Sequence, residues 1–337
     1  MYSVLLVRYC PAVNFLRSLA LNTRYTLSRH RREMRVRDLV AENRAPISVL
    51  FYHRVADCYP NDWTISCKQF VRHIDYCREH FEIISLAEAQ SRLQKKHSPR
   101  PAVVITFDDG YAENMRYAIP WLISNRIPCT YFVTTENVRH GWPFRHDIEN
   151  DRPLDVNTVE QLRAASQCGV EIGLHTANHV DFNCITTRSE LESEIIDAKM
   201  DLEIMIGRQV DYFAVPYGMP QQMRPAVIQT AKACGLRGIC SAFGGYNMVG
   251  EDPFHIRRIH GDPDFVRLRN WLSFDERKFR HNPTLPTDDV LEETGVCDKT
   301  SANGTGKDAT LSATADLMDS ASLLGGASLL PNSTFQT

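Results

Sequence analysis

The stretch "VVITFDDG" (residues 103–110) places two adjacent carboxylates and a glycine at the end of an apolar run. The β-branched residues of this run, which follow Pro101, predict a strand buried on both faces, as in parallel sheets. Asp108 and Asp109 then lie at the carboxyl end of the strand, where α/β sheets and barrels build their sites. Two like charges are costly there unless a cation or a proton shares them, although an ordinary Asp-Asp-Gly turn explains the same residues equally well.

Strand-like and helix-like segments alternate on both sides of this stretch. We expect strands at Ile47–Tyr52, Val103–Phe107, Thr130–Thr134, Val170–Leu174, Tyr212–Ala214 and Gly238–Ser241. We expect helices at Cys67–His80, Ser85–Gln94, Pro120–Asn125, Thr158–Gln167, Thr187–Ile206 and Pro220–Cys234. Repeated alternation of this kind predicts an α/β fold with a parallel sheet, either open or closed into a barrel.

The composition is that of an ordinary globular protein. Its 337 residues, 43% of them hydrophobic, are enough for one barrel-sized domain or two smaller ones. A formal net charge of -3 excludes a general attraction to nucleic acid. Ten cysteines without a Cys-x-x-Cys pair indicate reduced thiols. With no convincing export signal and no apolar run long enough to span a membrane, we expect a cytoplasmic protein.

The two ends of the chain differ from its middle. Residues 1–44 carry nine arginines against three acidic residues. This basic extension suits either an anionic membrane surface or, as its irregular apolar spacing favours, a helix packed on the main domain. Residues 285–337 are rich in Ser, Thr, Ala, Gly and Asp, which predicts a disordered low-complexity tail. The main domain is then expected at residues 45–278.

A second polar group follows the strand expected to end at Leu174. The segment "LHTANH" holds His175 and His179, and a loop at a strand end can turn both imidazoles toward one ion. Two histidines and one aspartate are the donors of a catalytic zinc-like site, which keeps a fourth position for water. The other aspartate of the pair would then be free to act as a general base near that water. The pattern therefore indicates a metal-assisted hydrolase.

Three ordered motifs carry a resemblance to a known family. "TFDDG" (residues 106–110), "HTANH" (175–179) and "FAVPYG" (213–218) resemble the polysaccharide deacetylase family, the carbohydrate esterases of family four that share the NodB homology domain. The similarity covers roughly residues 45–275. It implies a distorted (β/α)7 barrel as the fold of the main domain.

The resemblance also implies roles for individual residues. Asp109, His175 and His179 would bind one divalent metal ion, usually zinc in this family. Asp108 would be the general base. Pro216 and Tyr217 would line the sugar groove, and the backbone N–H of Tyr217 would help to stabilise the oxyanion.

The sequence departs from the family pattern in two places. Many members carry an arginine that orients the catalytic aspartate where this chain has Ala214, although one branch has the Phe-Ala-x-Pro-Tyr-Gly form. We expect Arg257 or Arg258 to replace that arginine. The histidine that protonates the leaving amine is also not obvious, and His260 and His53 are the two candidates.

The resulting hypothesis is a metal-dependent hydrolase that removes N-acetyl groups from the amino sugars of a polysaccharide or glycoconjugate and releases acetate. Two alternatives stay open: another acyl or C–N substrate, such as an O-acetyl ester, peptidoglycan or a lipid-linked sugar, and a carbohydrate-binding protein that has lost catalysis. A two-metal phosphoesterase is disfavoured because no further carboxylate cluster is evident. Trp63, Trp142 and Tyr246 are candidates for stacking on sugar rings, with core packing as the default for each.

Overall fold

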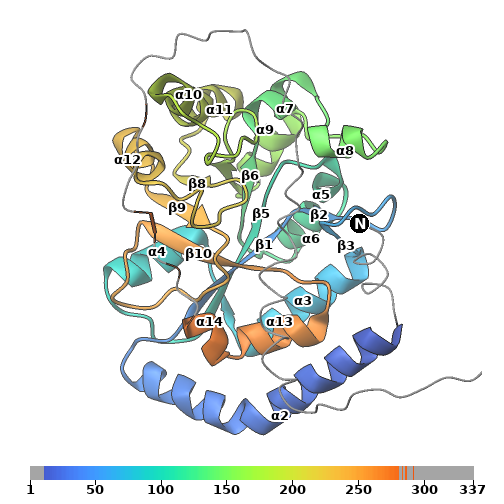
Figure 1. Cartoon of the computed structure of the whole chain (residues 1–337), viewed down its shortest axis with the longest axis vertical. Helices are drawn as coiled ribbons and strands as arrows, with labels where there is room; N and C mark the ends of the chain where they lie inside the picture. The colour runs from blue at the N-terminus through green and yellow to red at the C-terminus, as the bar shows by residue number, and fades with distance from the viewer. Residues whose placement is uncertain (1–10, 281–282, 284, 287–290, 292–337) are drawn as a thin grey trace, which may run out of the picture. The chain divides into compact units, whose positions relative to one another are not determined.

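Seven parallel strands close into a barrel in the computed structural model (Figure 1). In order around the ring they are β1 (Ile47–Tyr52), β5 (Ala102–Phe107), β6 (Cys129–Val133), β7 (Glu171–Leu174), β8 (Tyr212–Ala214), β9 (Gly238–Ser241) and β10 (His255–His260). The ring closes because β1 pairs in parallel with both β5 and β10. The expected (β/α)7 barrel is confirmed, and each strand predicted from the sequence is present to within one residue at either end.

The structure describes residues 11–280, 283, 285, 286 and 291. Contacts divide the chain into a unit of residues 1–295 and a second unit of residues 296–337, so every described residue lies in the first unit. The tail predicted for residues 285–337 lies almost wholly outside the described residues, and its disorder stays a prediction.

Four strands of the structure were not predicted from the sequence. Three have two residues each: β2 (Arg54–Val55) pairs with β3 (Thr64–Ile65), and β4 (Glu82–Ile83) pairs with the start of β5. The fourth is β10, which has the sequence "HIRRIH" and lacks the apolar run expected of a buried strand. The sequence did not predict β10 because its two arginines are polar, and only the closed barrel buries one of them, Arg258.

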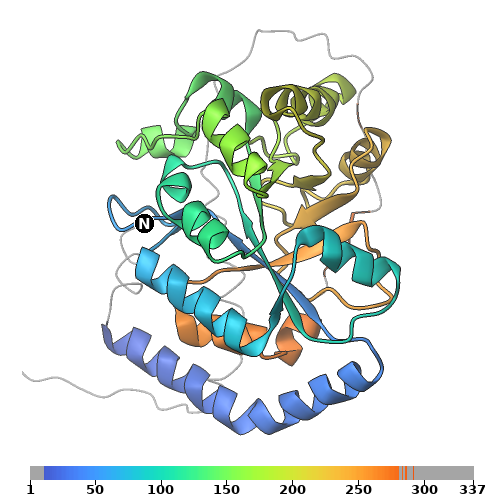
Figure 2. The same ribbon diagram turned by 180° about the vertical axis from the view of Figure 1, so that it is seen from behind.

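Helices fill the connections between the strands (Figures 1 and 2). The longer ones are α2 (Pro11–Ala41), α3 (Cys67–His80), α4 (Leu86–Gln94), α9 (Val159–Gln167), α11 (Ala198–Ile206), α12 (Pro225–Ala233) and α13 (Phe265–Leu272). The shorter ones are α5 (Ala112–Arg116), α6 (Ala118–Ser124), α7 (Thr135–His140), α8 (Arg145–Glu149), α10 (Arg188–Glu192) and α14 (Glu276–Arg280). The helix predicted at Thr187–Ile206 is present with its capping box, but a π-helical turn, η1 (Ser193–Asp197), interrupts it.

Side chains alternate between the inside and the outside of the barrel, as strand geometry requires. The interior cluster includes Val49, Val104 and Ile256, whereas a second, larger core includes Leu50, Ile105 and Ile259 and packs under the helices. Gly173 leaves space for one interior side chain, because a Cβ there would lie 2.4 Å from the Phe132 ring. The same alternation aims Thr106, Asp108 and Arg258 along the inner face at the carboxyl end. Thr106 and Asp108 follow Val104 at every second residue, and Arg258 follows Ile256 in the same way.

The basic N-terminal segment forms α2, which lies beneath α3 and α13 in both views (Figures 1 and 2). Buried Arg32 donates to the Asn270 carbonyl at 3.0 Å and to Ser273 Oγ at 2.7 Å, and Arg24 pairs with Asp275 at 2.7 Å. The alternative of a helix packed on the main domain therefore agrees with the structure. Among the described residues, no helix is both long and apolar enough to cross a membrane.

Candidate metal and active site

Asp109, His175 and His179 come together at the carboxyl ends of β5 and β7. The Nε2 atoms of His175 and His179 lie 3.5 Å and 3.3 Å from Asp109 Oδ1, and the three donor atoms are within 4.8 Å of one another. In the described part of the chain this is the one group of His, Cys, Asp or Glu side chains with the spacing of a metal site. The predicted ligand set is therefore brought together by the fold.

The hydrogen bonds around this triad leave its donor atoms facing one another. His175 Nδ1 lies 2.7 Å from the Ala214 carbonyl, which can only accept, so Nδ1 carries the proton and Nε2 keeps its lone pair. Asp109 Oδ1 is buried and has no hydrogen-bond partner among the described residues. A divalent cation between these atoms would satisfy all three, and two nitrogens with one carboxylate oxygen suit zinc. The residues present fit the implied metal ion.

The charge and the backbone of the triad support the same interpretation. Burial disfavours the charged form of Asp109, but the nearby imidazoles of His175 and His179 outweigh it and hold the pKa of Asp109 well below 3.8. Asp109 and His179 also have left-handed backbones, with φ of 73° and 54°. Such conformations are unfavourable for residues other than glycine and gather at functional sites. The fold thus holds an anionic ligand in a conformation that the chain alone would avoid.

Asp108 is paired with an arginine inside the barrel. Arg258 Nη1 donates to Asp108 Oδ1 at 2.6 Å, and Arg258 Nε donates to the Ser241 carbonyl at 3.3 Å. The guanidinium also lies 4.9 Å and 5.4 Å from the ring centroids of Phe51 and Phe132. Burial opposes the ionisation of Asp108, but the charge of Arg258 holds the pKa of Asp108 below 3.8. Asp108 is therefore an oriented carboxylate at neutral pH.

The sequence left Arg257 and Arg258 as alternatives for the arginine that orients Asp108. Arg257 points to the other face of β10, where its Nη1 pairs with Glu251 and also donates to the Tyr246 carbonyl at 3.3 Å. Adjacent residues of a strand point to opposite faces, so of the two arginines expected as alternatives Arg258 is the one that contacts Asp108. The positive charge beside Asp108 is thus supplied from β10.

His53, Trp63 and His260 form a second group at the carboxyl ends of β1 and β10. The ring centroid of His53 is 4.7 Å from that of Trp63 and 6.4 Å from that of His260. His260 ends β10 and pairs with Phe51 of β1, so it lies at the barrel mouth and not in an exposed loop. Asn114 Nδ2 donates to the His53 carbonyl at 2.6 Å and thereby fixes the start of the following loop.

The two histidines have different electrostatic surroundings. Burial lowers the pKa of His53, while the charges of Asp109 and Asp108 act in the opposite direction. Burial, followed by the charges of His53 and Arg267, lowers the pKa of His260 to about 3. Of these two imidazoles, His53 is the one that feels both aspartates, and His260 is neutral at pH 7.

The turn after β8 brings Tyr217 to the edge of the triad. Its ring centroid is 5.5 Å from that of His179, and its side chain is 57% exposed, whereas Pro216 is buried. The backbone of Tyr217 is left-handed, with φ of 60°. Its N–H has no main-chain acceptor in the described part of the chain. Tyr217 therefore borders the site directly, whereas Pro216 is buried behind the surface.

The three aromatic residues considered for sugar stacking differ in exposure and in what they contact. Trp63 is 36% exposed beside His53 and His260. Trp142 is 56% exposed but stacks on His140, with centroids 4.3 Å apart. Tyr246 is buried in the core and its hydroxyl donates to the Trp271 carbonyl. Trp63 is the one of the three that lies against a candidate catalytic residue.

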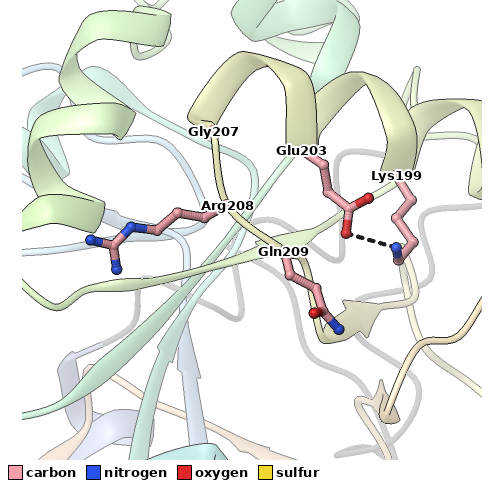
Figure 3. A pocket seen from close by; sticks show the side chains of 5 residues that line it. All are labelled: Lys199, Glu203, Gly207, Arg208 and Gln209. Atoms are coloured by element: carbon pink, nitrogen blue, oxygen red, sulfur yellow. Dashed lines mark hydrogen bonds and ion pairs between the residues drawn. The ribbon is translucent and has the colours of Figure 1, made fainter.

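A separate hollow lies at the end of α11 (Figure 3) and is lined by Lys199, Glu203, Gly207, Arg208 and Gln209. Lys199 and Glu203, one turn apart on α11, form an ion pair at 2.7 Å. Because Gly207 ends a helix that leads into β8, the hollow is at the amino ends of the strands. It is thus distinct from the triad, which is at the carboxyl ends.

Fold and site together define a class: an α/β-barrel protein with a candidate hydrolytic metal site at its mouth. Residues 95–239 match the family model for polysaccharide deacetylase. YxkH of Bacillus subtilis (strain 168), a polysaccharide deacetylase by provisional name, is 27% identical over 179 residues, which are 52% of this chain and 58% of YxkH. The chain thus spans little more than half the length of that relative.

Solved structures share the fold. IcaB from Ammonifex degensii superposes with a TM-score of 0.57 and 23% identity over 68% of this chain and 97% of IcaB. The Streptococcus pyogenes deacetylase PplD, solved in complex with acetate, has a TM-score of 0.57 and 19% identity over 69% of this chain and 99% of PplD. A de-N-acetylase from Aggregatibacter actinomycetemcomitans has a TM-score of 0.56 and 20% identity over 67% of this chain and 99% of its own.

The segment that matches is similar to the polysaccharide deacetylase family. The matched segment contains Asp108, Asp109, His175, His179 and Tyr217. The second group of side chains, at the ends of β1 and β10, lies outside the matched segment. Membership of the branch with the Phe-Ala-x-Pro-Tyr-Gly motif stays a prediction.

Proposed function

We propose that this protein is a metal-dependent hydrolase that removes N-acetyl groups from the amino sugars of a polysaccharide or glycoconjugate. The observation that carries the proposal is the buried, unpartnered Oδ1 of Asp109 facing the Nε2 atoms of His175 and His179. Asp108, beside this triad, is held ionised by Arg258. A metal site next to a separate carboxylate is what hydrolysis of an unactivated amide requires.

The proposed mechanism divides the work among the residues of the site. Asp109, His175 and His179 hold one divalent cation, most simply Zn²⁺, which when bound supplies water with a pKa near ~7 instead of ~15.7 and polarises a carbonyl. Asp108 accepts the proton of the attacking water. The N–H of Tyr217 donates to the oxygen of the acetyl group as negative charge develops there. Arg258 keeps Asp108 oriented and ionised throughout.

The departing amine needs a proton, and we assign its delivery to His53. Burial lowers the pKa of its imidazole, but the negative charges of Asp109 and Asp108 oppose that effect and favour a proton on the ring. His260 has a pKa of about 3, so it is a poor proton store at neutral pH. We assign His260 to packing against His53, at a ring separation of 6.4 Å.

Support for the amino-sugar substrate comes from the relatives and from the rim of the site. One similar structure is that of a de-N-acetylase, and another deacetylase was solved with acetate. The exposed ring of Trp63 lies beside His53, and the exposed ring of Tyr217 lies beside His179. Aromatic rings in such positions suit the apolar face of a sugar.

Acetate release tests the proposal. The full chain, loaded with Zn²⁺, is incubated with chitooligosaccharides beside Asp108→Asn and His175→Ala variants. We expect acetate and free amines from the wild type, a loss of about 10²- to 10⁴-fold in Asp108→Asn, and no zinc retained by His175→Ala. Asp108→Asn should keep its metal, which separates loss of the base from loss of the ion.

Other outcomes favour the alternatives. Release from an O-acetylated xylan or from peptidoglycan, but not from chitooligosaccharides, would change the substrate and keep the mechanism. Sugar binding without acetate release from any of them, with one zinc ion bound, would favour a carbohydrate-binding protein that has lost catalysis. More than one ion per chain would revive the two-metal hypothesis.

Location and membrane contact are further parts of the proposal. We infer a cytoplasmic protein whose helix α2 can touch an anionic membrane surface, because Leu16, Leu27 and Met34 are exposed on an arginine-rich helix. Co-sedimentation with vesicles of mixed phosphatidylcholine and phosphatidylserine, compared with phosphatidylcholine alone, tests the contact. Equal recovery with both vesicle types contradicts it.

A further inference from the structure

The loop that carries both histidines of the triad is strained. Between His175 and His179 the chain uses left-handed backbone at Thr176, with φ of 67°, and again at His179, with φ of 54°. Neither residue is a glycine, and residues with a side chain adopt this conformation only when their surroundings impose it. The positions of the two imidazoles therefore depend on whatever holds this loop.

The hydrogen bonds of the loop show what holds it. Its carbonyl groups accept from the start of α7: Thr135 N–H donates to Thr176 O at 3.1 Å, and Glu136 N–H donates to Ala177 O at 3.0 Å. Its N–H groups point the other way. Both Ala177 N–H and Asn178 N–H donate to one oxygen of Glu194, each at 3.0 Å.

The hydrogen bonds of Glu194 in the described part of the chain all go to this loop. Its second oxygen accepts from Asn178 Nδ2 at 2.8 Å, so the carboxylate receives three N–H donors from two adjacent loop residues. The residue is 7% exposed, and no ion pair to it occurs in the described part of the chain. It lies in the π-helical turn η1, and such turns inside helices are frequent at functional sites. A buried carboxylate whose partners all belong to the ligand loop has no evident other purpose.

We propose that Glu194 is a positioning residue for the metal site: it fixes the loop from His175 to His179 so that both Nε2 atoms face Asp109. The inference rests on the metal site of the proposed function and deepens it. In the described part of the chain no hydrogen bond or ion pair joins Glu194 to either ligand side chain, so it acts through the backbone of Ala177 and Asn178. Its loss releases the strained loop, and metal affinity falls because the two nitrogens must be brought back together on binding.

The test is the zinc affinity of the full chain, measured by competition with a chromogenic chelator in the absence of substrate. In Glu194→Gln the amide group keeps the size of the side chain but turns an N–H donor toward the loop. We expect the zinc Kd to rise by about 10- to 100-fold. Excess zinc should then restore acetate release, because the ligands themselves are intact. A wild-type Kd in a folded Glu194→Gln variant overturns the proposal.

The matched control is Glu190→Gln, which removes a carboxylate from the exposed capping box of the same helical segment. We expect its zinc Kd to equal that of the wild type. Thermal unfolding of the metal-free proteins separates the two roles: a lower Tm with an unchanged Kd would make Glu194 merely structural, and would overturn the proposal.

A second variant covers the case in which Glu194→Gln does not fold. Asn178→Ala removes one of the three donors and leaves the backbone contacts, so we expect a smaller rise in the zinc Kd, and no rise counts against the proposal. Zinc binding and acetate release are measured separately. A folded protein that binds zinc with this dependence on Glu194 but releases no acetate would sink the proposed function alone.

Discussion

The two sides of the barrel mouth are built in different ways. On the side of β5, β7 and β8, the metal triad comes from residues close in sequence to strand ends, and main-chain groups such as the Ala214 carbonyl orient it. On the side of β1 and β10, Arg258 reaches Asp108 across 150 positions of the sequence. The first side is a local pattern, and the second is a product of barrel closure. The family model, which matches residues 95–239, covers the first side and not β1 or β10.

The sharpest test of this comparison is to remove a ligand from the first side. We expect His179→Ala to lose zinc and all measurable acetate release, because the metal site drops to two protein ligands. His53→Ala, on the second side, should retain one zinc ion per chain. Metal content after dialysis checks both. Zinc loss in His53→Ala would show that the two sides are not separate.

The next largest effect should come from the proton donor of the second side. We expect His53→Ala to lower kcat by about 10²- to 10⁴-fold, as for removal of a general acid. His260→Ala serves as the matched control, since this imidazole has a pKa of about 3 and stays neutral at the pH of the assay. Its kcat should change far less. If kcat fell further in His260→Ala than in His53→Ala, the proton donor would be His260.

The buried ion pair predicts effects on both stability and pH dependence. Arg258→Met leaves Asp108 buried without its cation, and we expect a loss of about 3–5 kcal/mol in the free energy of unfolding. In the wild type the folded pKa of Asp108 is below 3.8, so the stabilisation is present above about pH 4 and is lost as the pH falls through the folded pKa. Without Arg258, burial raises this pKa, and the acid limb of kcat/KM should move to higher pH.

Arg257→Met is the control for that experiment. Its guanidinium pairs with Glu251 on the other face of β10, and the Arg257 side chain is 12% exposed. We expect the free energy of unfolding, measured with urea, to change less than in Arg258→Met. The acid limb of kcat/KM should stay at the pH of the wild type. An equal shift of the acid limb in both variants would mean that Arg258 acts only through the general charge of the strand.

The smallest effect should come from the rim. We expect Trp63→Ala to raise KM for a chitooligosaccharide by about 2- to 12-fold, which corresponds to the ~0.5–1.5 kcal/mol of an aromatic contact, with kcat nearly unchanged. Trp142→Ala should leave KM unchanged, because Trp142 stacks on His140 and not on a candidate catalytic residue. A large fall in kcat in Trp63→Ala would instead indicate that Trp63 orients His53.

The sequence predicted those parts of the molecule that depend on neighbours along the chain. Apolar runs between turn residues predicted six barrel strands, and Asp109, His175 and His179 were found because each follows a strand end. Strand β10 was missed because its charged residues are compensated only within the closed barrel. The choice of Arg258 over Arg257 follows from which face of β10 is the inner one, and no local pattern contains that information. The contacts of Glu194 with the ligand loop were also missed, because no local sequence pattern indicates them.

The position of Arg258 on the closing strand has a consequence for biosynthesis. Asp108 is made early and its arginine partner late, on the strand that seals the ring against β1. All three residues of the triad precede β10 in the chain, so they are synthesised before the arginine that pairs with Asp108.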